Sequence, residues 1–403
     1  MAKRTGGFIG QDGLNAPDQA TGVSASGGDT QVNVSFTSPS DVGGAAITGY
    51  RVQDSTGAFG VSGSSSPITV TGLSNGTSYT FNVWAINPFG WSSPSDASTG
   101  VTPVAAVYAM VAGFGSGTVN IDRFNISVQA NAADFGDLTS GRNSGNVMSS
   151  ATRTVFSCGR DGSTVFFNIL DYVNPTSAGN ATDFGDASYT KQFGSQFGSS
   201  TRGCVGGAEG PSQGAPKYQS YDTIDFITFA STGNASDFGN QTQITQVCAG
   251  FGSTTRGVRS GGYDGAGGGS SETNVMDYVT ISSQGNAIDF GDMTLARRGH
   301  GGCSSSTRGL NAGGFTGSTN TNSIDYVTIS NTGNATDFGD LIKMSGLNVR
   351  AASSHTVGAF IDSNNTIVTV TIASTGNATD FADLTGTTSD AYMTNSNGHG
   401  GLS

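Results

Sequence analysis

The sequence is poor in the residues that build solvated helices. Of its 403 residues only four are Lys and two are Glu, whereas 63 are Gly. Lys and Glu favour helices on exposed faces and Gly disfavours them. We therefore expect almost no helix.

Long apolar segments and paired cysteines are also missing. No run of 18 apolar residues is present, so we expect no membrane-spanning helix. The first ten residues lack the apolar core of a signal peptide, and we expect that the chain is not exported by the ordinary secretory route. The cysteines have no paired spacing typical of a disulfide framework or zinc site. We expect them to be small buried side chains: Cys158, Cys204, Cys248 and Cys303.

Positive charge is scarce as well. The chain has 17 Lys and Arg against 29 Asp and Glu, a net charge of -12. Residues 1–104 carry three cations and six anions, so both parts of the chain are acidic. This balance argues against binding to a nucleic-acid backbone, which depends on clustered Lys and Arg.

A repeat occupies most of the chain. The motif Asp-Phe-Gly-Asp, or a close variant, occurs six times, with spacings of 49, 54, 52, 48 and 43 residues between its phenylalanines. A period in this range is typical of a ring or array of identical supersecondary units. The phenylalanines are Phe135, Phe184, Phe238, Phe290, Phe338 and Phe381.

Each repeat predicts four short strands. The segment Asp325 to Ile329 alternates polar with apolar residues of the β-branched and aromatic types, and Gly or Asn bounds it. A four-stranded unit of this size cannot bury both faces alone, but stacking around an axis buries them and protects the sheet edges. We therefore expect a β-propeller.

Residues 105–403 resemble the kelch family of propellers. A Gly-Gly doublet closes one strand, as at Gly206-Gly207, Gly261-Gly262 and Gly313-Gly314, and a strand of the Ile-Asp-Tyr-Val type follows. The doublet changes to Cys158-Gly159, Ala112-Gly113 and Gly358-Ala359 in the other repeats. The Phe of Asp-Phe-Gly-Asp stands where kelch repeats usually place a Trp. The resemblance implies a six-bladed kelch-like propeller.

The two ends of the repeat region complement each other. The first repeat begins at Val107 with a doublet strand and lacks the strand that should precede it. The last repeat continues past Phe381 and ends in a segment, from Tyr392, that has the form of this missing strand. We expect the C-terminal strand to complete the first blade and close the ring.

Residues 16–104 resemble a fibronectin type III module. Val32, Val34 and Phe36 alternate along one strand, and Tyr79 follows Leu73 by six residues. Such sandwiches place there a tyrosine whose hydroxyl bonds back to the backbone. Together, the two resemblances imply an all-β chain. It would consist of a short N-terminal segment at 1–15, a sandwich at 16–104 and a propeller at 105–403.

The segment Arg4 to Pro17 that leads into the sandwich resembles structural proteins of tailed bacteriophages, especially those of marine cyanobacteria. Assembly into a particle released by lysis would bring an adhesion-type module outside the cell without a signal peptide. We expect a virion protein of the tail, a fibre or the capsid exterior. Its partners would be other virion proteins, with a homo-oligomer as a further possibility. The alternative is a receptor module that binds a host-surface glycan.

Enzymatic activity is not expected. Six copies of a carboxylate motif indicate blade geometry, because catalysis requires asymmetry around a ring. The Asp box of sialidase propellers is absent, and we expect no cofactor. The Gly-Asn-Ala-Thr-Asp segments are interpreted as turns, with calcium bound by their carboxylates as the alternative.

Two groups of residues are candidates for contacts. One is a set of arginines that follow Thr at equivalent repeat positions. They are expected either to join neighbouring blades or to form a belt that binds an acidic glycan or a partner's carboxylates. These are Arg153, Arg202, Arg256 and Arg308. The other lies in the Gly-rich N-terminal segment, which we expect to become ordered against the particle. It comprises Lys3, Arg4, Phe8 and Ile9.

Overall fold

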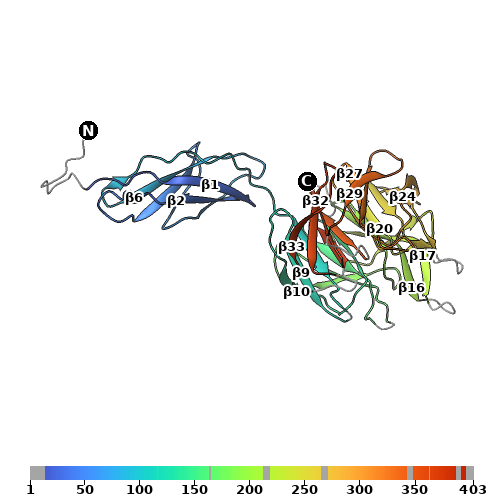
Figure 1. The fold of residues 1–403 in the computed structure, drawn as a ribbon. Coiled ribbons are helices and arrows are strands. Elements are labelled where there is room, and N and C mark those ends of the chain that lie inside the picture. Colours follow the sequence, from blue (N-terminus) through green and yellow to red (C-terminus); the bar gives the residue numbers. More distant parts are fainter. Residues whose placement is uncertain are drawn as a thin grey trace. The chain divides into compact units, whose positions relative to one another are not determined.

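The computed structural model describes residues 14–115, 117–162, 165–211, 218–264, 271–342, 348–362, 364–386 and 392–395. These residues form strands and turns, and they contain no helix, as the shortage of Lys and Glu predicted. The chain divides into two compact units, Met1–Ala106 and Val107–Ser403 (Figure 1).

The first unit is a sandwich of two antiparallel sheets. One sheet has the order β1 (Thr21–Gly28), β2 (Gln31–Thr37), β5 (Ile68–Thr71). The other has the order β4 (Gly60–Gly63), β3 (Gly49–Asp54), β6 (Phe81–Asn87), β7 (Gly90–Trp91). Alternate residues of β2 are buried, as the period of two requires of a strand with one face on the core.

Two expected features of the fibronectin-type core are present. The Ser74 amide donates a hydrogen bond to the Tyr79 hydroxyl over 3.1 Å, which is the tyrosine-corner bond. Phe36 is buried, and its ring centroid lies 4.7 Å from that of Tyr50. The prediction of a fibronectin-like sandwich is confirmed.

The described residues of the second unit form six four-stranded antiparallel sheets, which we number as blades 1 to 6, and one small three-stranded sheet. Blade 1 is β34 (Tyr392–Asn395), β8 (Tyr108–Ala112), β9 (Asn120–Asn125), β10 (Ala133–Asp137); blade 2 is β11 (Asn146–Ser149), β12 (Thr154–Ser157), β13 (Ile169–Val173), β14 (Thr182–Asp186). Blade 3 is β15 (Ser195–Gly198), β16 (Arg202–Pro211), β17 (Tyr218–Thr228), β18 (Ser236–Asn240); blade 4 is β20 (Ala249–Gly252), β21 (Arg256–Ser260), β24 (Val275–Thr280), β25 (Ile288–Asp292). Blade 5 is β26 (Gly301–Ser304), β27 (Arg308–Ala312), β28 (Ser323–Thr328), β29 (Thr336–Asp340); blade 6 is β30 (Arg350–Ser353), β31 (Val357–Ile361), β32 (Thr366–Thr371), β33 (Thr379–Asp383).

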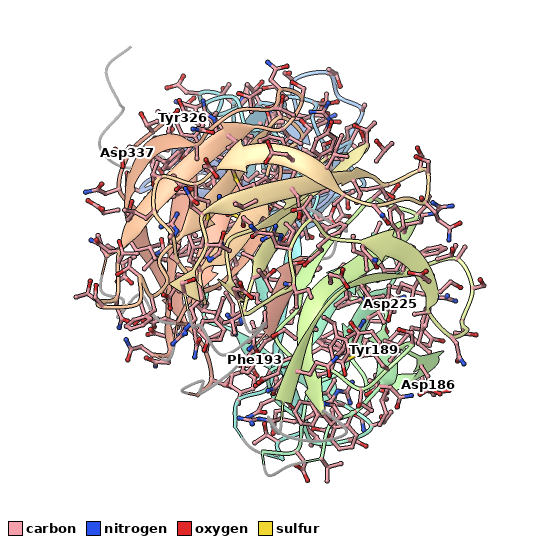
Figure 2. The ribbon with its side chains drawn as sticks, turned by 90° about the vertical axis from the view of Figure 1, so that its right-hand side faces the viewer. Asp186, Tyr189, Phe193, Asp225, Tyr326 and Asp337 are labelled. Carbon is pink, nitrogen blue, oxygen red and sulfur yellow. The ribbon has the colours of Figure 1, made fainter. Side chains whose placement is uncertain are left out.

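The blades form a ring around their first strands. Each first strand contacts the first strands of the two neighbouring blades, in the order β34, β11, β15, β20, β26, β30 and back to β34. Asp186 of blade 2 and Asp337 of blade 5, which belong to the same repeated motif, lie on opposite sides of the ring (Figure 2). The apolar core is shared between blades: Phe251 of blade 4 packs in one cluster with Val327 and Ile329 of blade 5. The predicted six-bladed, kelch-like fold is confirmed.

A strand from the end of the chain completes blade 1. β34 pairs antiparallel with β8, in a register that places Met393 opposite Val111. Met393 is fully buried in a cluster with residues of blades 1 and 6. The first blade therefore takes its innermost strand from the far end of the repeat region.

The repeated Gly-Asn-Ala and Asp-Phe-Gly-Asp motifs bind each other across the blade junctions. At every junction the Ala amide of one blade donates to the carbonyl of the last motif residue in the preceding blade, over 2.7 to 2.9 Å. The Asn Oδ1 accepts a hydrogen bond from the amide of that same residue over 3.0 to 3.2 Å. The asparagines are Asn131, Asn180, Asn234, Asn286, Asn334 and Asn377. The motifs recur because they hold the ring together.

At five of the six junctions, the point where the two motifs touch requires a glycine. Gly185 has a φ of +144°, and a Cβ at this position would collide with the Gly233 carbonyl of the next blade. The same pairing of glycines occurs at five junctions. At the sixth, between blades 6 and 1, both partners have changed: Ala382 stands in the first position and Ala130 in the second. The two sides of this contact have changed together.

Blade length varies in only one loop, apart from one extra residue before blade 6. The Asp on each third strand, or its equivalent Val368, precedes the first Asp of Asp-Phe-Gly-Asp by 12 residues, as with Asp225 and Asp237. The residues between the second and third strands differ instead: Arg202 precedes Asp225 by 23 residues, whereas Val357 precedes Val368 by 11. Antiparallel order places these loops on the same side of the ring as the linkers between blades. We call this side the loop face and the opposite side the junction face.

The Gly-Gly doublet marks the point where the chain leaves the second strand for the loop face. Gly261 and Gly262 have φ values of +55° and +104°, a region that favours glycine. The doublet assignments from the sequence need correction in three blades. Ala112 and Gly206 hold the strand position of Ser260, so in blades 1 and 3 the doublet begins one residue later, at Gly113 and Gly207. The third correction is in blade 6. Gly358 lies opposite Val370 within the β31–β32 ladder, as Gly309 lies opposite Val327 in blade 5, so Gly358-Ala359 is part of the strand. The short blade 6 loop has no doublet of this type.

Loss of the closing strand should open the ring. Deleting residues 392–403 removes β34 and exposes the edge of β8, which becomes free to pair with other chains. We expect this variant to aggregate, or to melt well below the intact protein by calorimetry. Deleting only residues 396–403 keeps β34 and is the matched control, which should melt as the intact protein does. Equal melting of the two variants would contradict the closure.

Candidate functional site

The four arginines selected from the sequence lie on the junction face, one in each of blades 2 to 5, and are partly buried. Each guanidinium donates through Nη1 to a backbone carbonyl that follows the third strand of the next blade. The bonds run from Arg153 to Phe229 O (2.6 Å), Arg202 to Ile281 O (2.9 Å), Arg256 to Ile329 O (3.0 Å) and Arg308 to Ile372 O (2.8 Å). This is the geometry of a staple between neighbouring blades.

An aromatic ring supports each of these arginines. The guanidinium carbon lies 4.3 to 5.1 Å from the centroid of a ring on the third strand of its own blade. The rings belong to Tyr172, Phe226, Tyr278 and Tyr326. A cation held over a ring in this way keeps a fixed direction, so the bond to the next blade is formed by a pre-oriented donor.

Blade 1 exchanges the positions of the two side chains. The register places Tyr108 at the arginine position and Arg123 at the aromatic position. The guanidinium of Arg123 still lies 4.3 Å from the Tyr108 ring centroid, and it still donates to the corresponding carbonyl of the next blade, Pro175 O, over 2.9 Å. Blade 6 replaces the arginine by Val357, which packs in one cluster with Ile126 of blade 1. The contact between blades is retained while its chemistry changes.

A second set of charged side chains, not identified from the sequence, is buried between blades. Four aspartates on third strands each form an ion pair of 2.7 to 2.9 Å with a cation, and the side chains are 0 to 4% exposed. Each aspartate also accepts hydrogen bonds from a Ser or Thr that follows the last strand of the preceding blade. The ion pairs are Arg142–Asp171, Lys191–Asp225, Arg259–Asp277 and Arg297–Asp325.

Blade 4 obtains its cation from a different element. In blades 2, 3 and 5 the cation lies on the linker before the first strand, but in blade 4 that position is Thr245. Arg259 of β21, directly opposite Asp277, takes the place of the linker cation. The sequence offered one signal for these pairs, which is the Asp repeated within the third strand.

Asp122 of blade 1 differs from the other four. It accepts hydrogen bonds from the amide and hydroxyl of Thr385 (3.1 and 2.6 Å), but the linker that precedes β34 carries no Lys or Arg between residues 384 and 391. Burial raises the pKa of the Asp122 carboxyl above its ordinary value, and the two hydrogen bonds from Thr385 offset part of this effect. Ionisation of this buried carboxyl therefore costs more free energy in the folded ring than in the unfolded chain.

The linkers between blades bond to each other on the loop face. The amides of Phe193, Val247 and Gly299 donate to the carbonyls of Ser144, Phe193 and Val247 over 2.8 to 3.0 Å. Phe193 and Val247 have φ values of +56°, which is strained for side chains of their size. A pocket is lined by these linkers and by residues of the first strands of blades 2 to 6. Figure 2 labels Phe193 together with Tyr189, on the linker that leads into blade 3.

Aromatic side chains gather on the loop face of blades 3 to 5. Tyr189 and Tyr221 lie with their ring centroids 4.6 Å apart. Tyr263 belongs to a small sheet of β19 (Thr245–Gln246), β22 (Tyr263–Asp264) and β23 (Ser271–Glu272). Arg298 lies 4.8 Å from the Tyr263 ring centroid and 5.1 Å from that of Phe315. These loops differ from blade to blade, whereas the contacts on the junction face repeat.

The remaining predicted features are the N-terminal candidate residues, metal sites, membrane-spanning helices and the cysteines. Lys3, Arg4, Phe8 and Ile9 lie outside the described residues. No group of His, Cys, Asp and Glu suited to a metal ion, and no helix able to cross a membrane, occurs among the described residues. Cys158, Cys204 and Cys303 are buried and Cys248 is partly buried, and burial raises the pKa of the Cys204 thiol to about 12.

Exchanging the arginine and its ring in blade 3 should preserve stability. Arg202→Tyr alone removes the donor to Ile281 O, and Phe226→Arg alone places a second cation beside Arg202. Each single variant should lose stability, whereas the double variant reproduces the arrangement of Tyr108 and Arg123. A double-mutant cycle from denaturant unfolding should give a favourable coupling of about 1–2 kcal/mol. Additive losses would contradict the staple.

The same substitution should have opposite effects in blades 1 and 5. Asp325→Asn leaves the buried Arg297 without a counter-charge and should cost about 3–5 kcal/mol. Asp122→Asn can still accept both hydrogen bonds from Thr385, and it removes the cost of ionising a buried carboxyl. Its stability at pH 7 should equal or exceed that of the wild type.

The pH dependence supplies a check on Asp122. Because its folded-state pKa is raised, this group contributes stability at acid pH, and that contribution is lost as the pH rises through the folded-state pKa. The advantage of Asp122→Asn in thermal unfolding should therefore disappear at acid pH. A loss at pH 7 as large as that of Asp325→Asn would contradict this account.

Comparison with known proteins identifies the first unit. No curated protein matches the sequence. A solved structure of YjhT is 9% identical, with a TM-score of 0.46, and the alignment covers 54% of this chain and 71% of that one. A structure of titin domains A168–A170 is 34% identical over 22% of this chain and 32% of that one, with a TM-score of 0.21. The fibronectin type III domain model matches residues 16–101. The sandwich is therefore a fibronectin type III domain.

Proposed function

We propose that this chain is a non-enzymatic structural and adhesion protein of a tailed-phage particle. It belongs to the tail, a fibre or the capsid exterior, where its N-terminal part docks to other virion proteins and the propeller projects. The fibronectin type III domain supports an adhesion role, and the resemblance of Arg4 to Pro17 to phage structural proteins supports the particle.

The observation that carries this proposal is the use of the repeated polar residues. The arginines bond to carbonyls of the next blade, four of the third-strand aspartates pair with buried cations, and the asparagines bind the preceding blade. A catalytic group must keep a free, reactive atom directed at a substrate. These repeated groups are instead used in joining blades, which favours a scaffold.

A second candidate function is a receptor module that binds a host-surface glycan. The loop face favours it, because loops of different length and sequence gather there with Tyr and Phe side chains. Insertions in repeat proteins commonly fall on one face, which is often the face that binds a partner. The two functions are compatible if the propeller is the projecting, adhesive end of a particle protein.

Removing the N-terminal segment should release the protein from the particle. A variant lacking residues 2–13 keeps the described sandwich intact and should be absent from purified particles, as judged by immunogold electron microscopy. The variant lacking residues 396–403 is the control and should be incorporated normally. Incorporation of the first variant at the wild-type level would contradict the docking role.

A further inference from the structure

We propose that four residues on the loop face between blades 4 and 5 form a carbohydrate-binding site for a neutral glycan. The residues are Tyr263, Glu272, Arg298 and Phe315. This inference rests on the adhesion role proposed above and names its ligand class.

The four side chains come together from separate loops. Tyr263 and Glu272 lie directly opposite each other in the small sheet of blade 4. Arg298 belongs to the linker that enters blade 5, and Phe315 to the loop after the second strand of blade 5. Arg298 and Phe315 bond to each other through both backbone amides, over 3.0 and 2.8 Å. The blade 5 loop also approaches Glu272 closely, since a Cβ at Gly317 would collide with the carboxylate.

The charged pair in this cluster is oriented, and its arginine remains accessible. Arg298 Nη1 lies 3.2 Å from Glu272 Oε1, and the side chains are 34% and 9% exposed. The two rings, with centroids 4.8 and 5.1 Å from the guanidinium carbon, limit the directions that the guanidinium can take. The cluster thus presents fixed donors and two partly exposed aromatic rings at the surface, and the largely buried Glu272 carboxylate beside them is the acceptor.

The ring itself does not need this chemistry. The positions equivalent to Arg298 are Asn143, Gln192 and Gln246, each of which forms the same type of backbone bridge with its own blade. In blade 3, Gln192 Nε2 bonds to Glu209 Oε2 over 2.6 Å and joins the same two segments without an arginine or an aromatic ring. A residue type that the fold does not require at this position is free to serve a ligand.

The chemistry of the cluster fits a neutral sugar. A carboxylate accepts hydrogen bonds from hydroxyl groups and a guanidinium donates to them. Tyr and Phe rings offer flat apolar surfaces of the kind that pack against the C–H face of a pyranose, and such partly exposed aromatics are typical of recognition sites. Because Arg298 and Glu272 neutralise each other, the cluster has no excess charge to attract an acidic or a basic ligand.

The test is binding of the purified full-length protein to an array of neutral and acidic oligosaccharides. We expect binding to neutral hexose-containing glycans that a free sugar of the same type displaces. Arg298→Gln places at this position the residue found in blades 3 and 4, so the fold should tolerate it. It should weaken binding at least tenfold with an unchanged melting temperature. Phe315→Leu, which removes one ring, should weaken binding in the same way.

Trp91→Ala is the control, because it removes an exposed aromatic side chain, 57% exposed, from the fibronectin type III domain. It should leave glycan binding unchanged. Three results would overturn the proposal: no binding to any neutral glycan, binding restricted to acidic glycans, or binding insensitive to both Arg298→Gln and Phe315→Leu. A loss of glycan binding in Trp91→Ala would place the binding site on the sandwich and would also overturn the proposal. Because the purified protein is used, failure here is distinct from failure to dock on a particle.

Discussion

The structure of the propeller depends on one contact, in which a loop of each blade docks on the outermost strand of the blade before it. An alanine amide and an asparagine side chain of the loop satisfy the carbonyl and the amide of a single residue on that strand. Bonds of this kind are otherwise made between strands of one sheet. Here they join separate sheets, and they occur at all six junctions, including the one between blades 6 and 1. The ring is therefore held at its circumference as well as through its apolar core.

Around this fixed contact, equivalent positions of the blades form their contacts with different side chains. A guanidinium and a ring exchange positions in blade 1, a strand arginine replaces a linker cation in blade 4, and Val368 with Ile342 forms an apolar contact where other blades pair Asp with Thr or Ser. In each of these three cases one change is matched by a second change, because a buried charge or polar group left alone is costly. The junction face thus keeps its contacts while the loop face, free of this constraint, varies.

Much of the architecture could be predicted from the sequence, because it depends on periodicity. The spacing of the six phenylalanines predicted the number of blades. The incomplete first repeat predicted the closing strand, and Leu73 with Tyr79 indicated the sandwich. The buried ion pairs could not be predicted, since Arg142 and Asp171 are 29 residues apart and their contact depends on how a linker turns. Gly358 was misassigned because the sequence shows only the residue types of a doublet, whereas the role of a doublet depends on its backbone φ angles. The cluster around Arg298 was missed because it combines loops that share no pattern.

The amides of six alanines in the junction loops form structural hydrogen bonds between blades. Native-state amide hydrogen exchange, read residue by residue, tests these bonds most directly. The account predicts that the amides of Ala132, Ala181, Ala235, Ala287, Ala335 and Ala378 exchange as slowly as amides within the blade ladders, although the loops lie at the surface. Exchange of these amides at the rate of open loops, with the ladder amides protected, would contradict it.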